Sequence, residues 1–181
     1  MARWGRADFQ QLKRMQKKME KLQNGDYEKF CEQAAKELAA RLLAKVIRRT
    51  PVGIYDQPVN FTTKDGDVVS FTPNTGMMGG TLRRGWTAKT EGEALSGGNT
   101  NATAYAESLI VRKTGSTYEI EIINPVNYAS YVEFGHRTAN HAGWVKGRFM
   151  LTISENELDA QAPKILEKKL MKFLGGVFGG D

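Results

Sequence analysis

The spacing of apolar residues changes at Pro51, and this change constrains the fold of the chain more than any other feature. Before Pro51 apolar side chains recur at steps of three and four, and after it they alternate with polar residues in short runs. Steps of three and four indicate amphipathic helices, whereas alternation indicates strands buried on one face. The C-terminal part returns to a step of four. Helices, then antiparallel strands, then a helix predict an α+β fold.

Two helices are predicted before Pro51. The first covers residues 8–24 and ends at Asn24-Gly25, because both residue types tolerate the left-handed backbone that stops a helix. The second covers residues 26–49, with Asp26 as its N-cap. A tight turn between the two would make a helical hairpin. The expected buried face of the second helix is Phe30, Ala34, Leu38, Leu42 and Val46.

The region after Pro51 is predicted to contain strands and loops. Residues 59–62 and 68–72 flank an Asp-Gly turn, which is a strong hairpin signal. Residues 105–113 and 118–123 flank Thr-Gly-Ser and predict a second antiparallel pair. We also expect a strand at 82–90, a short helix at 128–135, and loops at 73–80, 91–103 and 136–147.

A long helix is predicted over residues 149–174. Pro163 is expected to kink it, and Gly175-Gly176 is expected to end it. Ser154 and Glu157 have the spacing of a capping box, so a start near Ser154 is the alternative. The stripe expected to be buried is Leu158, Ala162, Leu166, Leu170 and Leu174.

Positive charge is concentrated near the N-terminus. The net charge is +6, and residues 1–50 alone carry 13 Lys and Arg against 6 Asp and Glu. This asymmetry favours an acidic partner, either DNA or a protein surface, although a solvated helix face is the simpler alternative. Of these two partners we favour a protein surface by a narrow margin. The basic arc of the first helix consists of Lys13, Arg14, Lys17, Lys18 and Lys21.

Patterns typical of catalytic and metal sites are missing from the sequence. Cys31 is the only cysteine, which excludes an intrachain disulfide and a cysteine-based zinc site. His136 and His141 lie on an expected loop with no third ligand suggested. We therefore expect no enzyme activity, no metal and no cofactor. No apolar run is long enough to span a membrane and no secretion signal opens the chain, so we expect a soluble protein made in the cytoplasm.

Three sequence segments together resemble one protein family. Residues 50–53 read Thr-Pro-Val-Gly, and residues 80–86 read Gly-Thr-Leu-Arg-Arg-Gly-Trp. Residues 128–135 read Tyr-Ala-Ser-Tyr-Val-Glu-Phe-Gly, followed by Gly-Arg-Phe-Met-Leu at 147–151. In this order the chain resembles the neck and tail-completion proteins of tailed bacteriophages, prophages and phage-tail-like particles. In that family the first segment runs almost directly into the second, so residues 54–79 resemble an insertion.

The resemblance implies a tail-terminator-like fold, in which a small antiparallel sheet is packed by an N-terminal helical hairpin and a long C-terminal helix. It also implies a closed ring, expected to be a hexamer, that caps the tail and joins it to the head around a DNA channel. The partners would be further copies of the chain, tail tube or sheath proteins, head-side connector proteins and passing DNA. The expected location is a virion or a tail-like particle assembled in a bacterial host.

The resemblance also implies roles for the motif residues. Pro51 would stop a helix and Gly53 would allow a turn into the sheet, while Leu82 and Trp86 would lie in the core. The residues expected at a surface or subunit boundary are Arg83, Arg84 and Glu133. Glu133 would pair with an arginine of a neighbour or be solvated. Tyr131, Val132 and Phe134 would supply apolar packing, and Gly135 would provide the turn that follows them.

The domain plan that follows is a basic N-terminal helix at 1–25, a single α+β domain at 26–174 and a flexible tail at 175–181. Two other functions stay open beside the ring subunit. The charge of the N-terminal region favours a basic nucleic-acid-binding protein. Against it, the sequence contains no recognition motif, and its aromatic residues are scattered rather than interleaved with the basic ones. An enzyme or toxin is the third alternative.

Overall fold

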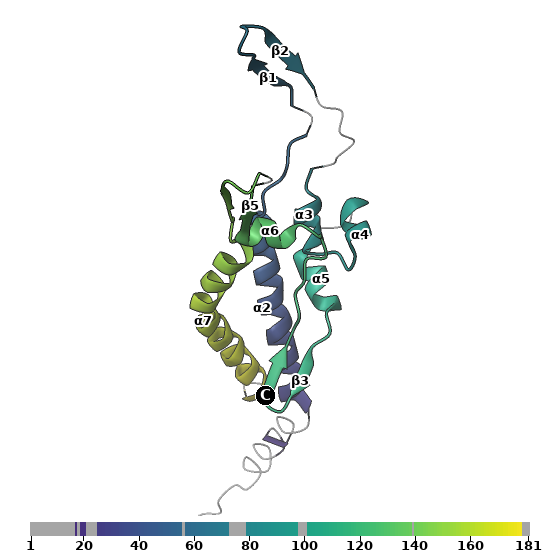
Figure 1. Ribbon diagram of the computed structural model, residues 1–181. Helices are drawn as coiled ribbons and strands as arrows, with labels where there is room; N and C mark the ends of the chain where they lie inside the picture. The colour runs from purple at the N-terminus through teal and green to yellow at the C-terminus, as the bar shows by residue number, and fades with distance from the viewer. Residues whose placement is uncertain are drawn as a thin grey trace, which may run out of the picture.

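Helix α2 (Tyr27–Arg49) forms the centre of the molecule. The structure is a computed structural model that describes residues 17, 19–20, 25–55, 57–72, 79–97, 101–138 and 140–178. Helix α2 packs against α5 (Ala102–Ser108) on one side and against the long helix α7 (Met150–Phe178) on the other (Figure 1).

The α+β fold class is confirmed, but the strands form separate ribbons. Within the described residues they make three antiparallel pairs, β1 with β2, β3 with β4 and β5 with β6, rather than one sheet. Three short helices complete the body: α3 (Thr81–Gly85), α4 (Glu91–Leu95) and α6 (Ala129–Phe134). The strands are β1 (Val59–Thr62), β2 (Val68–Phe71), β3 (Arg112–Thr114), β4 (Thr117–Glu119), β5 (Gly135–Arg137) and β6 (Trp144–Lys146).

The buried core lies where α2 meets the short helices and the start of α7. Leu43 and Val46 of α2 are fully buried, as is Met150 at the start of α7. The residues of the core cluster are Ala39, Leu43, Val46, Leu82, Trp86, Ala88, Ala94, Ala106, Val126 and Met150.

The predicted second helix is confirmed as α2. It ends at Arg49 with Thr50 as its C-cap, immediately before Pro51. Its buried residues include Ala34 and Val46, whereas Leu38 and Leu42 are only half-buried. Asp26 stands at the N-cap position but its side chain makes no capping hydrogen bond. The first predicted helix, and with it the helical hairpin, lies almost entirely outside the described residues.

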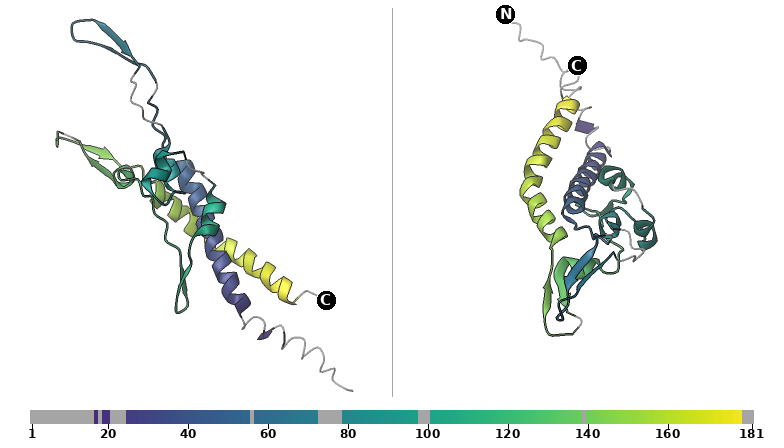
Figure 2. Two further views of the ribbon diagram at one scale, coloured as in Figure 1. Left: turned by 90° about the vertical axis from the view of Figure 1, so that its right-hand side faces the viewer. Right: turned by 90° about the horizontal axis from the view of Figure 1, so that it is seen from above.

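The C-terminal helix α7 is longer than predicted and buries a different face. It contains Pro163, curves along its length (Figure 2), and continues through Gly175-Gly176, so the predicted stop is wrong. Leu158 is buried as predicted. Leu166 and Leu170 are 36% and 40% exposed, so the prediction that they are buried is wrong. The prediction assumed a straight helix that packs on the body along its whole length.

Two further predictions about the α7 region are corrected. Ser154 is buried inside α7 and donates to the Met150 carbonyl oxygen, so the helix does not start there. The expected loop at 136–147 contains the β5–β6 ribbon, in which His136 pairs with Val145 and Arg137 with Trp144.

Between residues 59 and 123, the predictions that are confirmed are the two hairpins, whose turn sequences contain glycine. The hairpins around Gly66 and Gly115 are present, and both glycines have positive φ. The predicted strand at 82–90 is wrong, because residues 81–85 form helix α3. The predicted loop at 91–103 contains α4 and the start of α5. The strand predicted at 105–113 is wrong over residues 105–108, which belong to α5, and the hairpin keeps only the short strands β3 and β4.

Candidate interaction surfaces

The first two family-like segments meet at Thr50, which is completely buried. Its hydroxyl donates to the Val46 carbonyl oxygen at 2.7 Å and accepts the indole N–H of Trp86 at 2.8 Å. Its carbonyl oxygen accepts two hydrogen bonds from the Arg83 guanidinium, at 2.8 and 3.2 Å. The hydroxyl and the carbonyl oxygen of Thr50 therefore fasten the α3 segment to the end of α2. Sequence reasoning did not single out Thr50 for this role.

Arg84 is used within its own chain as well. Its guanidinium donates to the carbonyl oxygens of Gly79 and Ala94 at 3.0 and 2.8 Å, and to the Thr81 hydroxyl at 3.3 Å. It thereby links α3 to α4 and to the turn before α3. Leu82 lies in the core as predicted. Both arginines expected at a subunit boundary thus bind backbone carbonyl groups inside one subunit.

Glu133 is buried, so the interpretation as a solvated carboxylate is wrong. Its two carboxylate oxygens accept the backbone N–H groups of Leu151 and Thr152, each at 3.0 Å, and the Thr152 hydroxyl at 2.8 Å. These are the first-turn donors of α7, which a side chain at the N-cap normally satisfies. The residue before α7 is Phe149, whose side chain has no hydrogen-bond acceptor, so Glu133 supplies the cap from α6.

The third family-like segment ends in the predicted turn, but its aromatic residues are not packed inside. Gly135 has φ 88°, and a Cβ there would lie 2.3 Å from the Val145 carbonyl oxygen. Tyr131 and Phe134 are 58% and 61% exposed, so their predicted role as packing residues is wrong. Both precede the turn on the outer side of α6, and Tyr131 makes an edge contact with the His136 ring.

The β5–β6 ribbon and α6 form a surface rich in aromatic and basic side chains. Trp144 is exposed beside Arg137, its cross-strand partner. Residues 134–154 contain no Asp or Glu. We call this the aromatic-basic surface, and it consists of Tyr131, Phe134, His136, Arg137, Trp144, Lys146 and Arg148. Exposed aromatic residues together with arginine are typical of protein interfaces and of single-strand nucleic-acid sites.

The β1–β2 ribbon projects far from the body (Figure 1). We call residues 57–72 the arm. Directly paired residues share a face, so Val59 with Phe71 and Phe61 with Val69 form one apolar face of the arm. The arm belongs to the segment that resembled an insertion. Gly53 lies at its base with the Tyr55 ring against it, leaving less than 3 Å for a Cβ.

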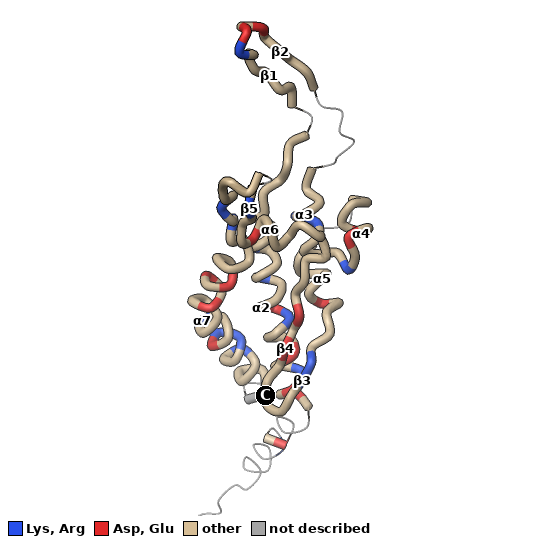
Figure 3. The backbone as a smooth tube through the Cα atoms, viewed as in Figure 1, with Lys and Arg blue, Asp and Glu red and all other residues tan. Residues whose placement is uncertain are grey.

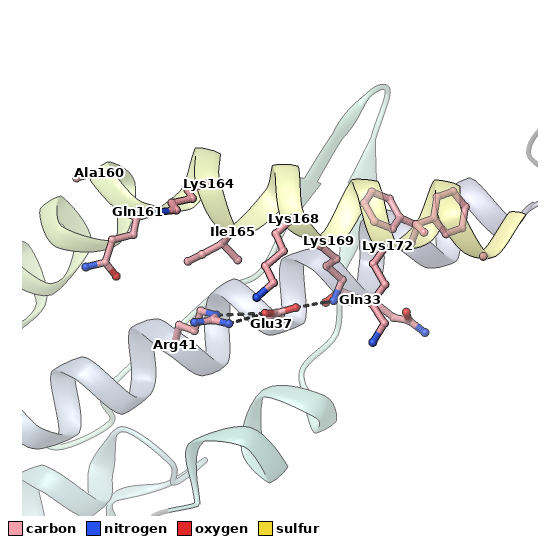
Figure 4. A pocket seen from close by; sticks show the side chains of 13 residues that line it. Gln33, Glu37, Arg41, Ala160, Gln161, Lys164, Ile165, Lys168, Lys169 and Lys172 are labelled. Carbon is pink, nitrogen blue, oxygen red and sulfur yellow. Dashed lines mark hydrogen bonds and ion pairs between the residues drawn. The ribbon is translucent and has the colours of Figure 1, made fainter. Parts of the chain in front are cut away.

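An open groove of about 940 Å³ runs between the first half of α2 and the second half of α7 (Figure 4). Phe30 and Phe173 stack across it with ring centroids 4.7 Å apart. Glu37 of α2 accepts hydrogen bonds from Lys169 and Arg41, each at 2.7 Å, and so closes its floor. We call this groove the α2–α7 groove.

The Glu37 contacts also make the groove sensitive to acid. Hydrogen bonds from the Lys169 ammonium and then the Arg41 guanidinium hold the pKa of the Glu37 carboxyl below its usual range. Because this pKa is depressed on folding, the contact stabilises the protein above the unfolded glutamate value of about 4.3 and is lost as pH falls through the folded value.

We therefore expect Glu37→Gln to flatten the acid side of the stability profile. The urea midpoint of the parent protein should fall between about pH 5 and pH 3, and that of the variant should fall less. Glu155→Gln, which removes an exposed carboxylate from the first half of α7, is the matched control and should leave the slope unchanged. Equal slopes for parent and Glu37→Gln would show that the contact does not couple to folding.

Of the five residues of the predicted basic arc, the structure describes Lys17, which is helical and exposed. Lys13, Arg14, Lys18 and Lys21 lie outside the described residues. Elsewhere charge is unevenly distributed along α7 (Figure 3): Glu155, Glu157 and Asp159 lie in its first half, and Lys168, Lys169 and Lys172 lie in its second half together with Glu167. Within the described residues, no helix combines the length and the apolar character that crossing a membrane would require.

An exposed apolar arm, exposed aromatic residues and an open groove on one chain are features of an assembly protein, whose surfaces are covered by other proteins. Comparison with known families agrees. Residues 13–135 match the family described as "Bacteriophage HK97-gp10, putative tail-component". The chain belongs to this HK97-gp10-like family of phage tail components, which is associated with the virion. No curated protein and no solved structure matches the chain.

Proposed function

We propose that this chain is a structural subunit, without enzyme activity, that forms a closed hexameric ring at the end of the phage tail. The ring caps the tail tube, contacts tube or sheath proteins on one side and the head-side connector on the other, and surrounds the channel through which DNA passes. The observation that carries this proposal is the arm, whose apolar face is exposed to solvent in the single chain.

The exposed arm favours assembly for two physical reasons. A two-stranded ribbon is marginally stable on its own in water, and an apolar face left in solvent gains free energy when another surface covers it. A closed ring also requires two different surfaces on each subunit, because its contacts run head to tail. The arm and the surfaces of the body are different in composition and position, as such contacts demand.

A nucleic-acid-binding protein is the second candidate function, and the aromatic-basic surface favours it. Aromatic and basic side chains lie next to one another there across β5 and β6, an arrangement that the sequence alone did not reveal. Binding through phosphates and stacked bases would be independent of sequence and would weaken steeply with salt.

Native mass spectrometry of the full chain, with and without purified tail tubes, tests the proposal. We expect a closed oligomer, with six subunits as the main species, and saturable attachment to tail ends. A chain that stays monomeric at high concentration and also with tails would contradict the ring. Tight, salt-sensitive DNA binding by such a monomer would instead support the second candidate.

A further inference from the structure

We propose that the arm of one subunit docks in the α2–α7 groove of the next subunit in the ring. This inference rests on the proposed ring and names the contact that would close it. The arm supplies an apolar face and an acidic tip. The groove supplies the apolar side chains of Phe30, Ile165 and Phe173 and a basic rim.

The arm carries apolar surface that its own chain does not cover. Val59, Phe61 and Phe71 are 41%, 49% and 49% exposed, and they share one face of the ribbon. The opposite face is more polar, with Asn60, Thr62 and Ser70 beside Val68. A ribbon with one apolar face is stabilised when another surface covers that face.

The α2–α7 groove offers apolar surface that lies open. Phe30 and Phe173 stand at one end of it, and Ile165 lies between the two helices (Figure 4). The two helices diverge there enough to leave about 940 Å³ accessible, a space in which the side chains of a ribbon face can be buried.

The arm tip and the α2–α7 groove also carry opposite charges. The arm tip carries Asp65 and Asp67 beside Lys64, a net negative charge (Figure 3). Lys164, Lys168 and Lys172 line the groove from α7, and Lys168 and Lys172 reach toward α2 in Figure 4. Unlike Lys169, none of these three makes an ion pair with any residue that the structure describes. Opposite potentials on two surfaces steer them together and fix their register.

The positions of the two surfaces indicate a neighbour rather than the same chain. The arm projects from one end of the molecule, and the groove lies at the other end, beside the C-terminal half of α7 (Figures 1 and 2). A subunit with both surfaces can give its arm to one neighbour and receive an arm from the other. This is a heterologous contact, the type that closes into rings.

The basic N-terminal segment of the chain is a poorer occupant of the groove. Residues 1–24 contain seven Lys and Arg against two Asp and Glu, so their charge has the same sign as the groove lysines. Like charges brought together at an interface are unfavourable. The acidic tip of the arm fits the groove better.

A charge swap tests the docking. Asp65→Lys with Asp67→Lys, and separately Lys168→Glu with Lys172→Glu, should each weaken ring assembly at least tenfold in native mass spectrometry of the full chain. The variant that combines all four substitutions should regain most of the assembly, because the charges of the two surfaces are exchanged and again attract each other. Phe61→Ser with Phe71→Ser should abolish rings. Asn60→Ala with Ser70→Ala, on the opposite face, is the matched control and should leave rings intact.

Several results would overturn the inference. Rings that form equally well in the arm and groove variants would show that neither surface closes them, while leaving the proposed function in place. Rings that persist in the arm variants but no longer attach to tails would assign the arm to a tail protein. Two charge variants that fail separately and are not rescued in combination would show that the two surfaces do not meet. A parent chain that never forms a ring would overturn the proposed ring together with this contact.

Discussion

Replacing Trp86 by alanine is expected to lower the free energy of unfolding by about 3–5 kcal/mol, the range for large aromatic residues removed from a core. Trp86 is only 4% exposed and lies in the cluster that joins α2, the short helices and α7. Its loss would leave a cavity beside Leu43 and Val46. It would also remove the N–H donor that binds the Thr50 hydroxyl. Urea unfolding followed by circular dichroism, at fixed protomer concentration, measures the change.

Two further variants separate packing from hydrogen bonding at this site. Trp86→Phe keeps most of the apolar volume and removes the N–H, so we expect a loss of about 1–2 kcal/mol. Trp144→Ala is the control, because Trp144 is 63% exposed and its removal should change stability by less than about 0.5 kcal/mol in the single chain. Losses of similar size for Trp86→Ala and Trp144→Ala would contradict the assignment of Trp86 to the core.

Sequence patterns predicted the elements whose signals are local. Pro51 ended α2, Asp65-Gly66 specified the β1–β2 turn, and Gly135 ended α6 with the positive φ that glycine tolerates. The identity of the core residues Leu82 and Trp86 was also correct. These features depend on residues close together in the chain, which is why the sequence contains them.

Short helices were missed because their apolar residues are too few to reveal a period. The segment that forms α3 was predicted as a strand, yet its buried residues Leu82 and Trp86 are four apart, as on one helix face. Helices α4 and α5 are preceded by the N-cap residues Thr90 and Asn101, whose side chains accept backbone N–H groups of the first turn. Those capping residues were visible in the sequence, but the nearby glycines favoured a loop.

Contacts between distant residues could not be predicted from any local pattern. Whether an arginine such as Arg83 or Arg84 binds a neighbour or its own backbone depends on which carbonyl groups the fold brings near it. The exposed state of Leu166 and Leu170 likewise depends on the path of α7, whose second half contacts α2 through Lys169 and Phe173 instead. The same path opens the α2–α7 groove.

Replacing Glu133 by alanine is expected to cost about 3 kcal/mol, because it removes a buried carboxylate and all three hydrogen bonds by which it caps the first turn of α7. The carboxylate also lies at the positive end of the helix dipole, so its charge contributes to the cap. Glu133→Gln keeps one acceptor oxygen and loses the charge, so we expect a smaller loss of about 1–2 kcal/mol. Urea unfolding at neutral pH measures both variants.

The same variants decide between a cap and a subunit contact for Glu133. If Glu133 paired mainly with an arginine of a neighbour, its removal would break rings and leave the stability of the monomer unchanged. As a cap, it should lower monomer stability first, and backbone amides near Leu151 and Thr152 should exchange hydrogen faster while the rest of α7 is less affected. Asp159→Ala, which removes an exposed carboxylate on the same helix, is the control and should change stability by less than about 0.5 kcal/mol. Glu133→Ala and Asp159→Ala with equal stabilities would show that α7 does not depend on the Glu133 carboxylate for its start.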